Sequence, residues 1–320
     1  MIHVSIIIPN LNGEKFLPNC LESLLKSIQK AKDIGAFEIT LVDNASTDKS
    51  YKIFSNFCTK NQIKFQTINL DRNYGFAGAI NKGIEVSKSE WVLLCNNDLK
   101  VDENWLLLIT KAILENSSSQ LAAVTGTVLS YGGTKIESQG LKFYYSGKCD
   151  NLSHGKAFTP KLKRQLLSQK PHFIWGASAA LTIYSRQILE NIGKFDDDFF
   201  AYEEDVDLAL RLHNLGYKTL YIPSALSYHL GGATGNQMGN FRNKMDAKNW
   251  FYIIIKNYSK REILKNLFPI IEQRLRNLSG LIKNSPLMEF FPTLVDTYNP
   301  VIKNFPKMMR KRKQKTFENK

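Results

Sequence analysis

The fold is decided by residues 4–43, VSIIIPNLNGEKFLPNCLESLLKSIQKAKDIGAFEITLVD, where two short apolar runs flank a longer amphipathic segment. The first run, Val4–Pro9, is nearly continuous in apolar residues, as expected for a strand buried on both faces. Phe16–Ile28 then repeats Leu and Ile at helical spacing, and Phe37–Val42 forms the second run. A strand, a crossover helix and another strand in this order predict a βαβ unit with parallel strands.

The same alternation continues along the chain and predicts an α/β fold, with a mostly parallel central sheet flanked by helices. Ser46 or Thr47 is expected to cap the second helix. Tyr131–Lys170, rich in Gly, Ser and Lys, is expected to form a loop or hairpin insertion beside the site. The further predicted strands are Ile63–Ile68, Trp91–Cys95, Ala122–Leu129, Phe173–Ile183 and Lys218–Pro223, and the further predicted helices end at Phe57, Val86 and Leu114.

Two acids stand directly after predicted strands, Asp43 after the second and Asp98 after the fourth. Ligands of parallel sheets bind beyond the carboxyl ends of the strands, so these acids should share one edge. A single acid after a strand is usually a turn former, but the shared edge favours a site. Such acids suit a divalent cation with a diphosphate, and Asp98 would then hold the metal. His229, before a run of glycines, is a further candidate ligand, although a lone His is more often structural.

An acid-rich stretch lies at residues 195–207, FDDDFFAYEEDVD, directly before a predicted helix that Gly216 ends. Acids in the first turn of a helix gain about 0.3–1 kcal/mol each from the helix dipole, which accounts for some of them. It does not account for so many carboxylates among large apolar side chains, where an unpaired charge is costly. We therefore predict a functional carboxylate here, acting as a general base toward an attacking hydroxyl.

The chain has 320 residues, a net charge of +14 and a pI near 9.4, which indicates an anionic partner such as nucleic acid, a membrane surface or a phosphorylated substrate. Its four cysteines are scattered without metal-binding spacing, which fits a reducing compartment. The first apolar run lacks a preceding basic region and ends at Pro9, so it predicts a strand and not a signal peptide. Since no apolar run approaches the roughly 20 residues that cross a bilayer, we expect a soluble or peripheral protein.

The character of the sequence changes after about Gly235, where basic residues and apolar residues repeat at helical spacing. Trp250–Ile255 lies among Lys and Arg, and Lys307–Lys315 is almost wholly basic. We expect two parts, a domain over residues 1–235 and a basic, amphipathic helical extension over 236–320. Such helices often lie on anionic membranes. The alternative is a helical cap packed on the first domain, followed by a solvated tail.

Six segments of this chain, taken in order, resemble the family 2 glycosyltransferases of the GT-A (nucleotide-diphospho-sugar transferase) fold, nearest to the bacterial rhamnosyltransferase-like branch. They are VSIIIPNLNGEKFLPNCLESLL, VDNASTDKS, NYGFAGAINKGI, WVLLCNNDLKVDENWL, WGASAALTIYSRQILENIGKFDDDFFAYEEDVDLALRLHNLGY and IPSALSYH. The resemblance covers about residues 3–235. It implies inverting, metal-dependent sugar transfer from a dTDP-, UDP- or GDP-sugar to a hydroxyl of a glycan or lipid-linked glycan. The basic C-terminus would suit a lipid-diphosphate-linked glycan at the inner, cytoplasmic face of the cell membrane, as in the synthesis of a cell-surface polysaccharide.

The resemblance also implies roles for single residues. Asp205 would be the catalytic base beside Glu204, and Trp175 and Gly176 would line the acceptor side. Asp98 and His229 would bind Mg²⁺ or Mn²⁺; the family's Asp-x-Asp motif begins here with Asn96, so that Asp98 is its one acid. The residues implied at the nucleotide are Pro9, Asn10, Asp43, Asn44, Asn73, Gly75, Phe76 and Asn97.

Other classes of protein fit the sequence less well. A nucleotidyltransferase would have a Gly-rich loop bearing Arg or Lys after the first strand, and Asn10–Gly13 is not one. A dinucleotide dehydrogenase would need G-x-G-x-x-G after a strand, which Gly75–Gly78 lacks. A non-catalytic module that binds carbohydrate or nucleic acid would account for the charge, but it would not need Asp43, Asp98 and Asp205 together. We therefore expect no nucleic-acid partner.

Overall fold

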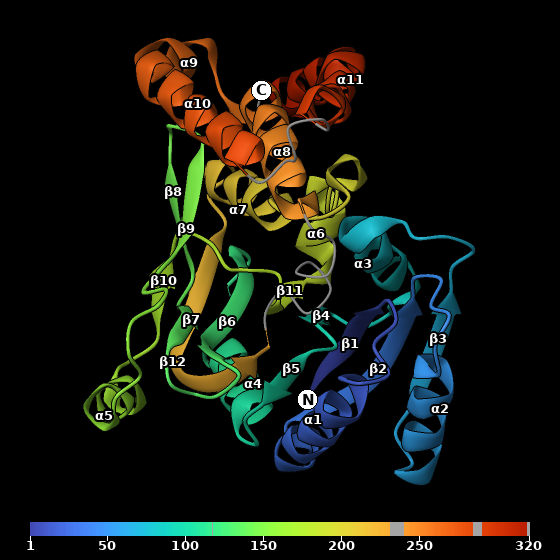
Figure 1. Cartoon of the computed structure of the whole chain (residues 1–320). Coiled ribbons are helices and arrows are strands. Elements are labelled where there is room, and N and C mark those ends of the chain that lie inside the picture. Colours follow the sequence, from blue (N-terminus) through green and yellow to red (C-terminus); the bar gives the residue numbers. More distant parts are fainter. Residues whose placement is uncertain (117, 231–239, 284–289, 319–320) are drawn as a thin grey trace.

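The computed structural model describes residues 1–116, 118–230, 240–283 and 290–318 and contains one large central sheet (Figure 1). Neighbouring strands β3, β2, β1 and β4 run parallel, as do β6 and β12, whereas β11 and β10 run antiparallel to their neighbours. The first four predicted strands are therefore parallel, as expected, and the sheet as a whole is mixed. In spatial order the strands are β10 (His172–Ile174), β12 (Lys218–His229), β6 (Leu121–Ser130), β11 (Leu181–Ser185), β4 (Trp91–Cys95), β1 (Ile2–Asn10), β2 (Gly35–Asp43) and β3 (Phe65–Asn69).

Helices cover both faces of the sheet, which is why its central strands are apolar on both sides. Successive side chains of a strand point to opposite faces, so Ile6 joins one apolar core and Ile7 the other, both fully buried. Helices α1 (Leu17–Ala31), α2 (Ser50–Lys60) and α4 (Trp105–Glu115) contribute to the core that contains Ile6. The core that contains Ile7 includes residues of α3 (Gly75–Val86), α6 (Arg186–Ile192) and α7 (Glu204–Asn214).

The expected helix cap at Ser46 or Thr47 is wrong, because α2 begins only at Ser50. The Ser46 hydroxyl instead accepts hydrogen bonds from the Asn10 side chain and the Asn12 backbone N–H, at 3.1 and 2.9 Å. The polar residues after β2 therefore fix the turn after β1, which is a contact between distant segments and not a local cap.

The expected single strand Phe173–Ile183 is also wrong, since the chain forms β10 and β11 with a loop between them. The loop leaves the sheet to pack on α7, where a Cβ on Gly176 would lie 2.6 Å from the Cβ of Ala209. The insertion Tyr131–Lys170 contains the expected hairpin but also an unexpected helix, which Thr159 caps. Its elements are β7 (Ile136–Ser138), β8 (Leu141–Tyr144), β9 (Lys148–Asn151) and α5 (Pro160–Ser168), while a further short strand, β5 (Leu99–Val101), pairs with β12.

The C-terminal extension is helical, as predicted, with α8 (Phe241–Asn257), α9 (Lys260–Lys265), α10 (Leu267–Lys283) and α11 (Phe290–Glu318). Helix α8 packs against α7, and both α10 and α11 pack against α8 (Figure 1). The boundary expected at residue 235 lies outside the described residues. Within the described part of the chain, none of the helices combines the length and the apolar character needed to span a bilayer.

Candidate active site

Side chains at the carboxyl ends of β1, β2 and β4 meet at one edge of the sheet. Asn10 and Asp43 end paired strands in register, and the Asn10 amide donates to the Asp43 carboxylate at 3.3 Å. The Asn97 amide, from the turn after β4, donates to the Asn10 side-chain oxygen at 2.8 Å. Pro9 precedes Asn10 on β1. The sheet therefore brings together four residues that the sequence assigned to one nucleotide pocket.

The loop before α3 is fixed by side-chain amides. Asn44 donates to the Asn73 side-chain oxygen at 2.8 Å and to the Gly75 carbonyl at 3.1 Å, and it accepts the Tyr74 N–H at 2.8 Å. Gly75 has a φ of +74°, and a Cβ there would lie 2.3 Å from the Phe200 carbonyl oxygen. Phe76 packs against the second apolar core. This loop therefore joins the edge near Asp43 to the segment that precedes Asp205.

Asp98 and His229 also meet, because β5 pairs with the end of β12. His229 Nε2 lies 3.0 Å from Asp98 Oδ1, and its Nδ1 lies 2.5 Å from Glu137 Oε1. Burial opposes the charged imidazole, but the two carboxylates outweigh it and raise the pKa of His229 to about 10. Sequence reasoning missed Glu137, whose one signal was its place in an insertion expected beside the site.

The oxygen-rich surroundings of Asp98 fit a divalent cation. The side-chain oxygen of Asn96 is buried without a hydrogen-bond partner, two residues from Asp98. Within the described residues, no group of three or more His, Cys, Asp and Glu side chains has the arrangement of a metal site. Mg²⁺ commonly takes only one or two protein carboxylates and completes its shell with substrate phosphate and water. Asp98 and His229 would therefore suffice only with a phosphate-bearing ligand.

Asp205 is the second residue of α7, and its carboxylate is held by backbone N–H groups. Its carboxylate accepts hydrogen bonds from Val206 at 2.8 Å and Ala179 at 3.1 Å, whereas one carboxyl oxygen of Glu204 is buried without a partner. Burial raises the pKa of both groups, that of Glu204 well above its ordinary value. Since hydrogen bonds to N–H groups favour the charged form, the negative charge of this pair belongs on Asp205 and the proton on Glu204.

The turn before Asp205 is strained and is held from the extension. Phe200, Tyr202 and Glu203 have φ values of 67°, 67° and 65°, which side chains other than Gly rarely adopt. The fully buried Asn249 of α8 places its amide nitrogen 2.7–3.1 Å from the carbonyl oxygens of Phe199, Ala201 and Tyr202. The extension therefore fixes the backbone that presents Asp205.

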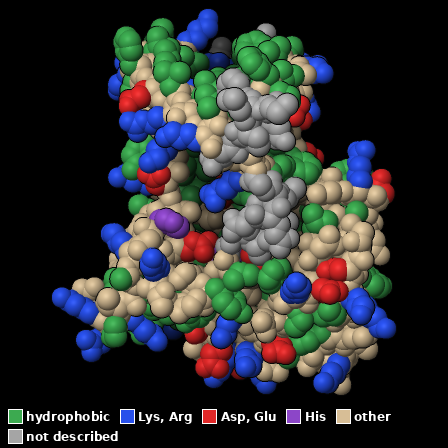
Figure 2. Space-filling model, in the orientation of Figure 1, with side chains coloured by type: hydrophobic (Ala, Val, Ile, Leu, Met, Phe, Trp, Pro, Cys, Tyr) green, Lys and Arg blue, Asp and Glu red, His purple; other side chains and the backbone are tan. Residues whose placement is uncertain are grey.

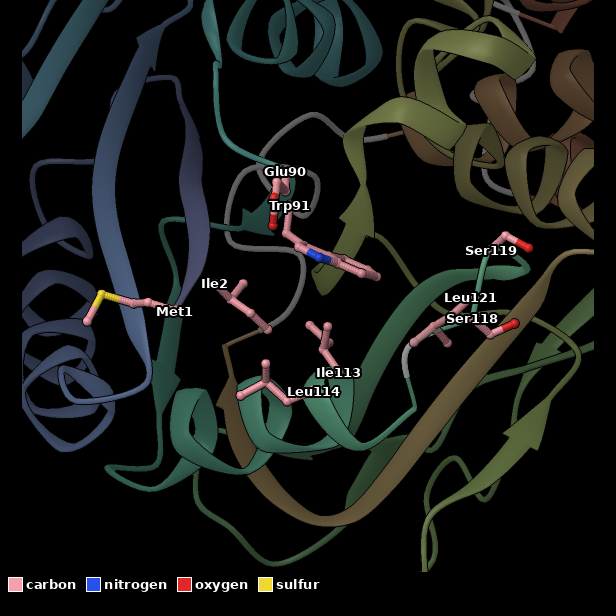
Figure 3. A pocket seen from close by; sticks show the side chains of 9 residues that line it. All are labelled: Met1, Ile2, Glu90, Trp91, Ile113, Leu114, Ser118, Ser119 and Leu121. Atoms are coloured by element: carbon pink, nitrogen blue, oxygen red, sulfur yellow. The ribbon is translucent and has the colours of Figure 1, made fainter.

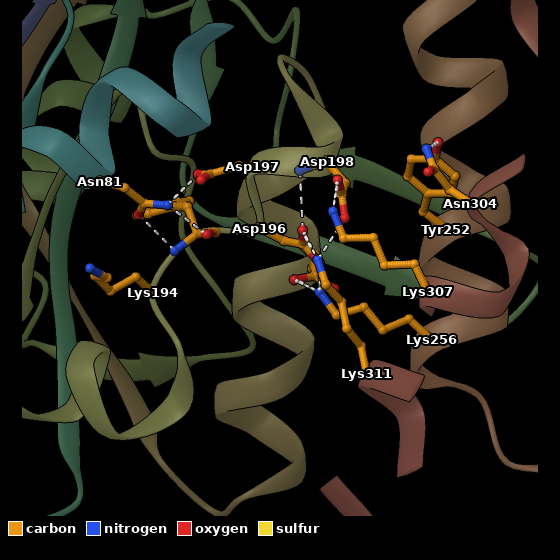
Figure 4. A network of polar contacts seen from close by, with 12 residues as sticks. Asn81, Lys194, Asp196, Asp197, Asp198, Tyr252, Lys256, Asn304, Lys307 and Lys311 are labelled. Atoms are coloured by element: carbon orange, nitrogen blue, oxygen red, sulfur yellow. Dashed lines mark hydrogen bonds and ion pairs between the residues drawn. The ribbon is translucent and has the colours of Figure 1, made fainter. Parts of the chain in front are cut away.

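Several acids of the acid-rich stretch are neutralised by lysines of the extension (Figure 4). Lys256 is buried between Asp196 at 2.6 Å and Asp207 at 2.8 Å. Lys311 pairs with Asp196 and with Asp198, which Lys307 also contacts. Asp207 also pairs with Arg211 of its own helix at 2.8 Å. These acids are structural ion-pair partners, which leaves Asp197, Glu203, Glu204 and Asp205 without an ion pair in the described part of the molecule, and Asp197 instead accepts a hydrogen bond from the Asn81 amide.

A continuous path of contacts joins the three predicted carboxylates. Asp43 connects through Asn10 to Asn97, which adjoins Asp98. The neighbouring backbone N–H of Asn96 donates to the Ala180 carbonyl at 3.0 Å, and the N–H of Ala179 donates to Asp205. The loop between β10 and β11 therefore carries the path from the sheet edge to α7.

Trp175 and Gly176 belong to the same loop. Trp175 stacks on Phe143 of the hairpin, with ring centroids 4.8 Å apart and an interplanar angle of 9°. The Gly176 carbonyl accepts the Leu141 N–H at 2.9 Å. These contacts place both residues where the hairpin meets α7, and Trp250 of α8 also lies against Phe143.

A hollow lies at the opposite edge of the sheet, near the amino ends of β1, β4 and β6 (Figure 3). Ile2, Trp91, Ile113 and Leu121 line it with several small or polar neighbours, and Glu90 is its single acid. It shares no residue with the path between Asp43 and Asp205, so it is not part of the candidate site.

Comparison with known proteins gives the family of the chain. Residues 5–193 match the family model described as glycosyl transferase family 2. A poly-beta-1,6-N-acetyl-D-glucosamine synthase of Staphylococcus epidermidis is 24% identical over 227 residues, which cover 71% of this chain and 50% of that protein. The glycosyltransferase GlyG of Streptococcus pneumoniae is 30% identical over 142 residues, 44% of this chain and 43% of that one. The chain thus spans about half the length, or less, of these relatives.

Solved structures share the fold. TarS 1–349 from S. aureus superposes with a TM-score of 0.61 at 15% identity, covering 97% of this chain and 83% of that one. GalNAc-T7, crystallised with UDP, GalNAc and Mn²⁺, gives a TM-score of 0.59 at 18% identity over 80% of this chain and 48% of that one. At such low identities the likeness concerns the fold alone.

Proposed function

The chain belongs to glycosyl transferase family 2 and has the GT-A fold, and on that premise we propose that it transfers a sugar from a nucleoside diphosphate donor to an acceptor hydroxyl. The observation that carries the proposal is the contact path from Asp43 through Asp98 to Asp205. Asp43 would bind the nucleoside, Asp98 would lie at the diphosphate, and Asp205 would take the proton of the acceptor. Attack from the side opposite the leaving diphosphate gives inversion at the anomeric carbon.

We propose that Asp98 and His229 hold Mg²⁺ or Mn²⁺, in keeping with the Mn²⁺ named for GalNAc-T7. The cation would take the place of the proton on His229 Nε2, which faces Asp98, so its binding would release that proton. The cation would offset the negative charge that develops on the diphosphate. Pro9, Asn10, Asn44, Asn73, Gly75, Phe76 and Asn97 would shape the nucleotide pocket, and Trp175 and Gly176 the acceptor side. In this proposal residues 1–235 form the transferase domain and 236–320 its extension.

The donor is proposed by class. Structural neighbours were crystallised with UDP-GlcNAc or GDP-Man, which supports a nucleotide sugar. The likeness to the rhamnosyltransferase-like branch favours a deoxysugar such as rhamnose on dTDP. The acceptor would be a glycan or lipid-linked glycan of a cell-surface polysaccharide, because the Staphylococcus epidermidis relative is a polysaccharide synthase. An enzyme that uses such an acceptor would work at the cytoplasmic face of the cell membrane.

A donor screen tests the proposed function. UDP-, GDP- and dTDP-sugars are each incubated with the protein and Mn²⁺, Mg²⁺ or EDTA, and nucleoside diphosphate release is measured. We expect slow hydrolysis of one donor class, which EDTA abolishes. In a separate incubation the protein receives a nucleoside triphosphate together with a sugar phosphate. Release of pyrophosphate from the triphosphate in that incubation would instead identify a nucleotidyltransferase.

Glu137→Gln should weaken use of the cation without removing a contact to His229. The carboxamide oxygen still accepts the imidazole N–H, but the negative charge that orients and polarises the ring is lost. Changes of this kind behind a metal-binding His typically cost about 10- to 100-fold in metal affinity. The measurement is the Mn²⁺ concentration at half-maximal donor hydrolysis, together with Mn²⁺ binding by calorimetry. Glu115→Gln on α4, whose side chain pairs with Lys111, is the matched control and should titrate as wild type.

A further inference from the structure

The positive charge of the protein is concentrated in the extension. Residues 236–320 contain 18 Lys and Arg against six Asp and Glu, so they carry 12 of the 14 net positive charges. Among the described residues, Lys256, Lys307 and Lys311 pair with Asp196, Asp198 and Asp207. Lys248 is buried against the carbonyls of Asp198 and Phe199, and Arg274 lies over Trp250. An excess of this size favours an anionic partner for the extension itself.

Helix α10 leaves an apolar stripe exposed. Phe268, Ile271, Leu275 and Ile282 follow helical spacing on one side of it, and their side chains are exposed by 84%, 47%, 59% and 44%. The neighbouring side of the helix packs against α8, so the stripe is not needed for the core. Exposed large apolar groups in such a row mark an interaction surface more often than a solvated one.

Helix α11 repeats the pattern. Phe291, Val295, Ile302 and Phe305 lie along one side of the helix and are exposed by 74%, 59%, 74% and 49%. Both helices pack against α8 at the same end of the molecule (Figure 1), and apolar side chains gather at that end in the space-filling view (Figure 2). Two separate helices therefore expose apolar stripes at the same end.

We propose that these stripes of α10 and α11, which we call the lipid-facing surface, bind an anionic phospholipid bilayer. The exposed basic residues Lys265, Lys283 and Lys303 lie one to three positions from a stripe residue in the sequence and would meet lipid headgroups while the apolar residues enter the acyl boundary. Arg276, next to Leu275, is also exposed and pairs with Glu272. A second copy of the chain fits this surface poorly, because it would bring another +12 extension against the first.

Binding of the bilayer by the lipid-facing surface would hold the active site near the membrane. The lipid-facing surface rests on α8, and α8 holds the turn before Asp205 through Asn249. The bilayer surface would then lie at a fixed distance from Asp205, and a lipid-linked acceptor would present its hydroxyl from that surface. This inference rests on the proposed transferase function for its purpose, but the binding itself can be measured independently.

The test is sedimentation of the full chain with vesicles of phosphatidylglycerol and phosphatidylcholine, or of phosphatidylcholine alone, at 0.15 M salt, roughly physiological ionic strength. We expect binding to the anionic vesicles only. Phe268→Ser with Leu275→Ser, and separately Phe291→Ser with Ile302→Ser, should each weaken it by about tenfold or more. Lys265→Glu with Lys283→Glu should weaken it similarly. Tyr51→Ser on α2, exposed by 45%, is the control and should bind as wild type.

Three results would overturn the proposal. These are no sedimentation with anionic vesicles, binding that survives both pairs of apolar substitutions, and light scattering that shows a dimer which these substitutions dissociate. Hydrolysis of a soluble nucleotide sugar by the same variants separates the two proposals. Variants with substitutions in the lipid-facing surface should keep that hydrolytic activity. Asp205→Asn should sediment with anionic vesicles as the wild type does.

Discussion

Asp205→Asn should reduce sugar transfer by about 10³-fold, since a positioned general base contributes about 10²- to 10⁴-fold. The amide has the same size and can keep a hydrogen bond to the N–H of Ala179 or Val206, but it cannot take the acceptor's proton. Donor binding should survive, because Asp43 and Asp98 are untouched. The measurements are transfer kinetics and binding of the nucleoside diphosphate by calorimetry.

Glu204→Gln supplies the matched control. If Glu204 is the protonated member of the pair, the amide replaces a neutral group of the same shape, and transfer should fall by no more than about threefold. The pH profile gives a second readout. Because burial raises the pKa of Asp205, and the base must be ionised to work, activity should fall with decreasing pH at a higher pH than an ordinary Asp would give. Equal losses in both variants, or normal transfer by Asp205→Asn, would exclude Asp205 as the base.

The part of the site that follows from strand order could be predicted from the sequence. Asp43 and Asp98 stand after strands with clear apolar patterns, and the rule that parallel strands end at one edge brings them together without knowledge of packing. Asn10 and Asn97, at the ends of two of the same strands, were assigned only through the resemblance to the family. The prediction of a single strand over Phe173–Ile183 was wrong because the chain at Gly176 leaves the sheet and packs against α7. That packing is a tertiary contact, which a local sequence pattern does not predict.

The residues that finish the site come from far along the chain. Glu137 meets His229 across 92 residues, and Asn249 meets the turn before Asp205 from a helix that begins only at Phe241. Neither belongs to a motif, so sequence alone could not assign them. The acid-rich stretch was predicted to be functional, but Asp196 pairs with lysines of α8 and α11, and Asp207 pairs with Lys256 of α8 as well as with Arg211 of its own helix. In the sequence these lysines are indistinguishable from the other basic residues of the extension.

Lys256→Met should lower the free energy of unfolding by about 3–5 kcal/mol, the usual cost of removing one partner from a buried ion pair. Methionine fills similar space, so the loss would come from the Asp196 and Asp207 carboxylates, which would face one another without the ammonium between them. Asp196 keeps Lys311 and Asp207 keeps Arg211 as partners, so the loss should lie near the lower end of this range. Urea unfolding followed by circular dichroism measures the change. Lys307→Met is the control, because Lys307 is 48% exposed in its pair with Asp198 and should contribute at most about 1 kcal/mol.

The pH dependence of that loss identifies its electrostatic origin. Burial alone would raise the pKa of Asp196. The positive charges of Lys256 and Lys311 outweigh the effect of burial and hold this pKa below the ordinary value of 3.8. A carboxyl with a lowered pKa in the folded state contributes stability that is present above its ordinary pKa and is lost as the pH falls through the lowered one. In Lys256→Met the acids instead gain from protonation, so the gap between variant and wild type should narrow from pH 7 toward pH 4. A gap that stays constant over this range would mean that packing around the Lys256 side chain, and not the ion pair, joins the extension to the segment that carries Asp205.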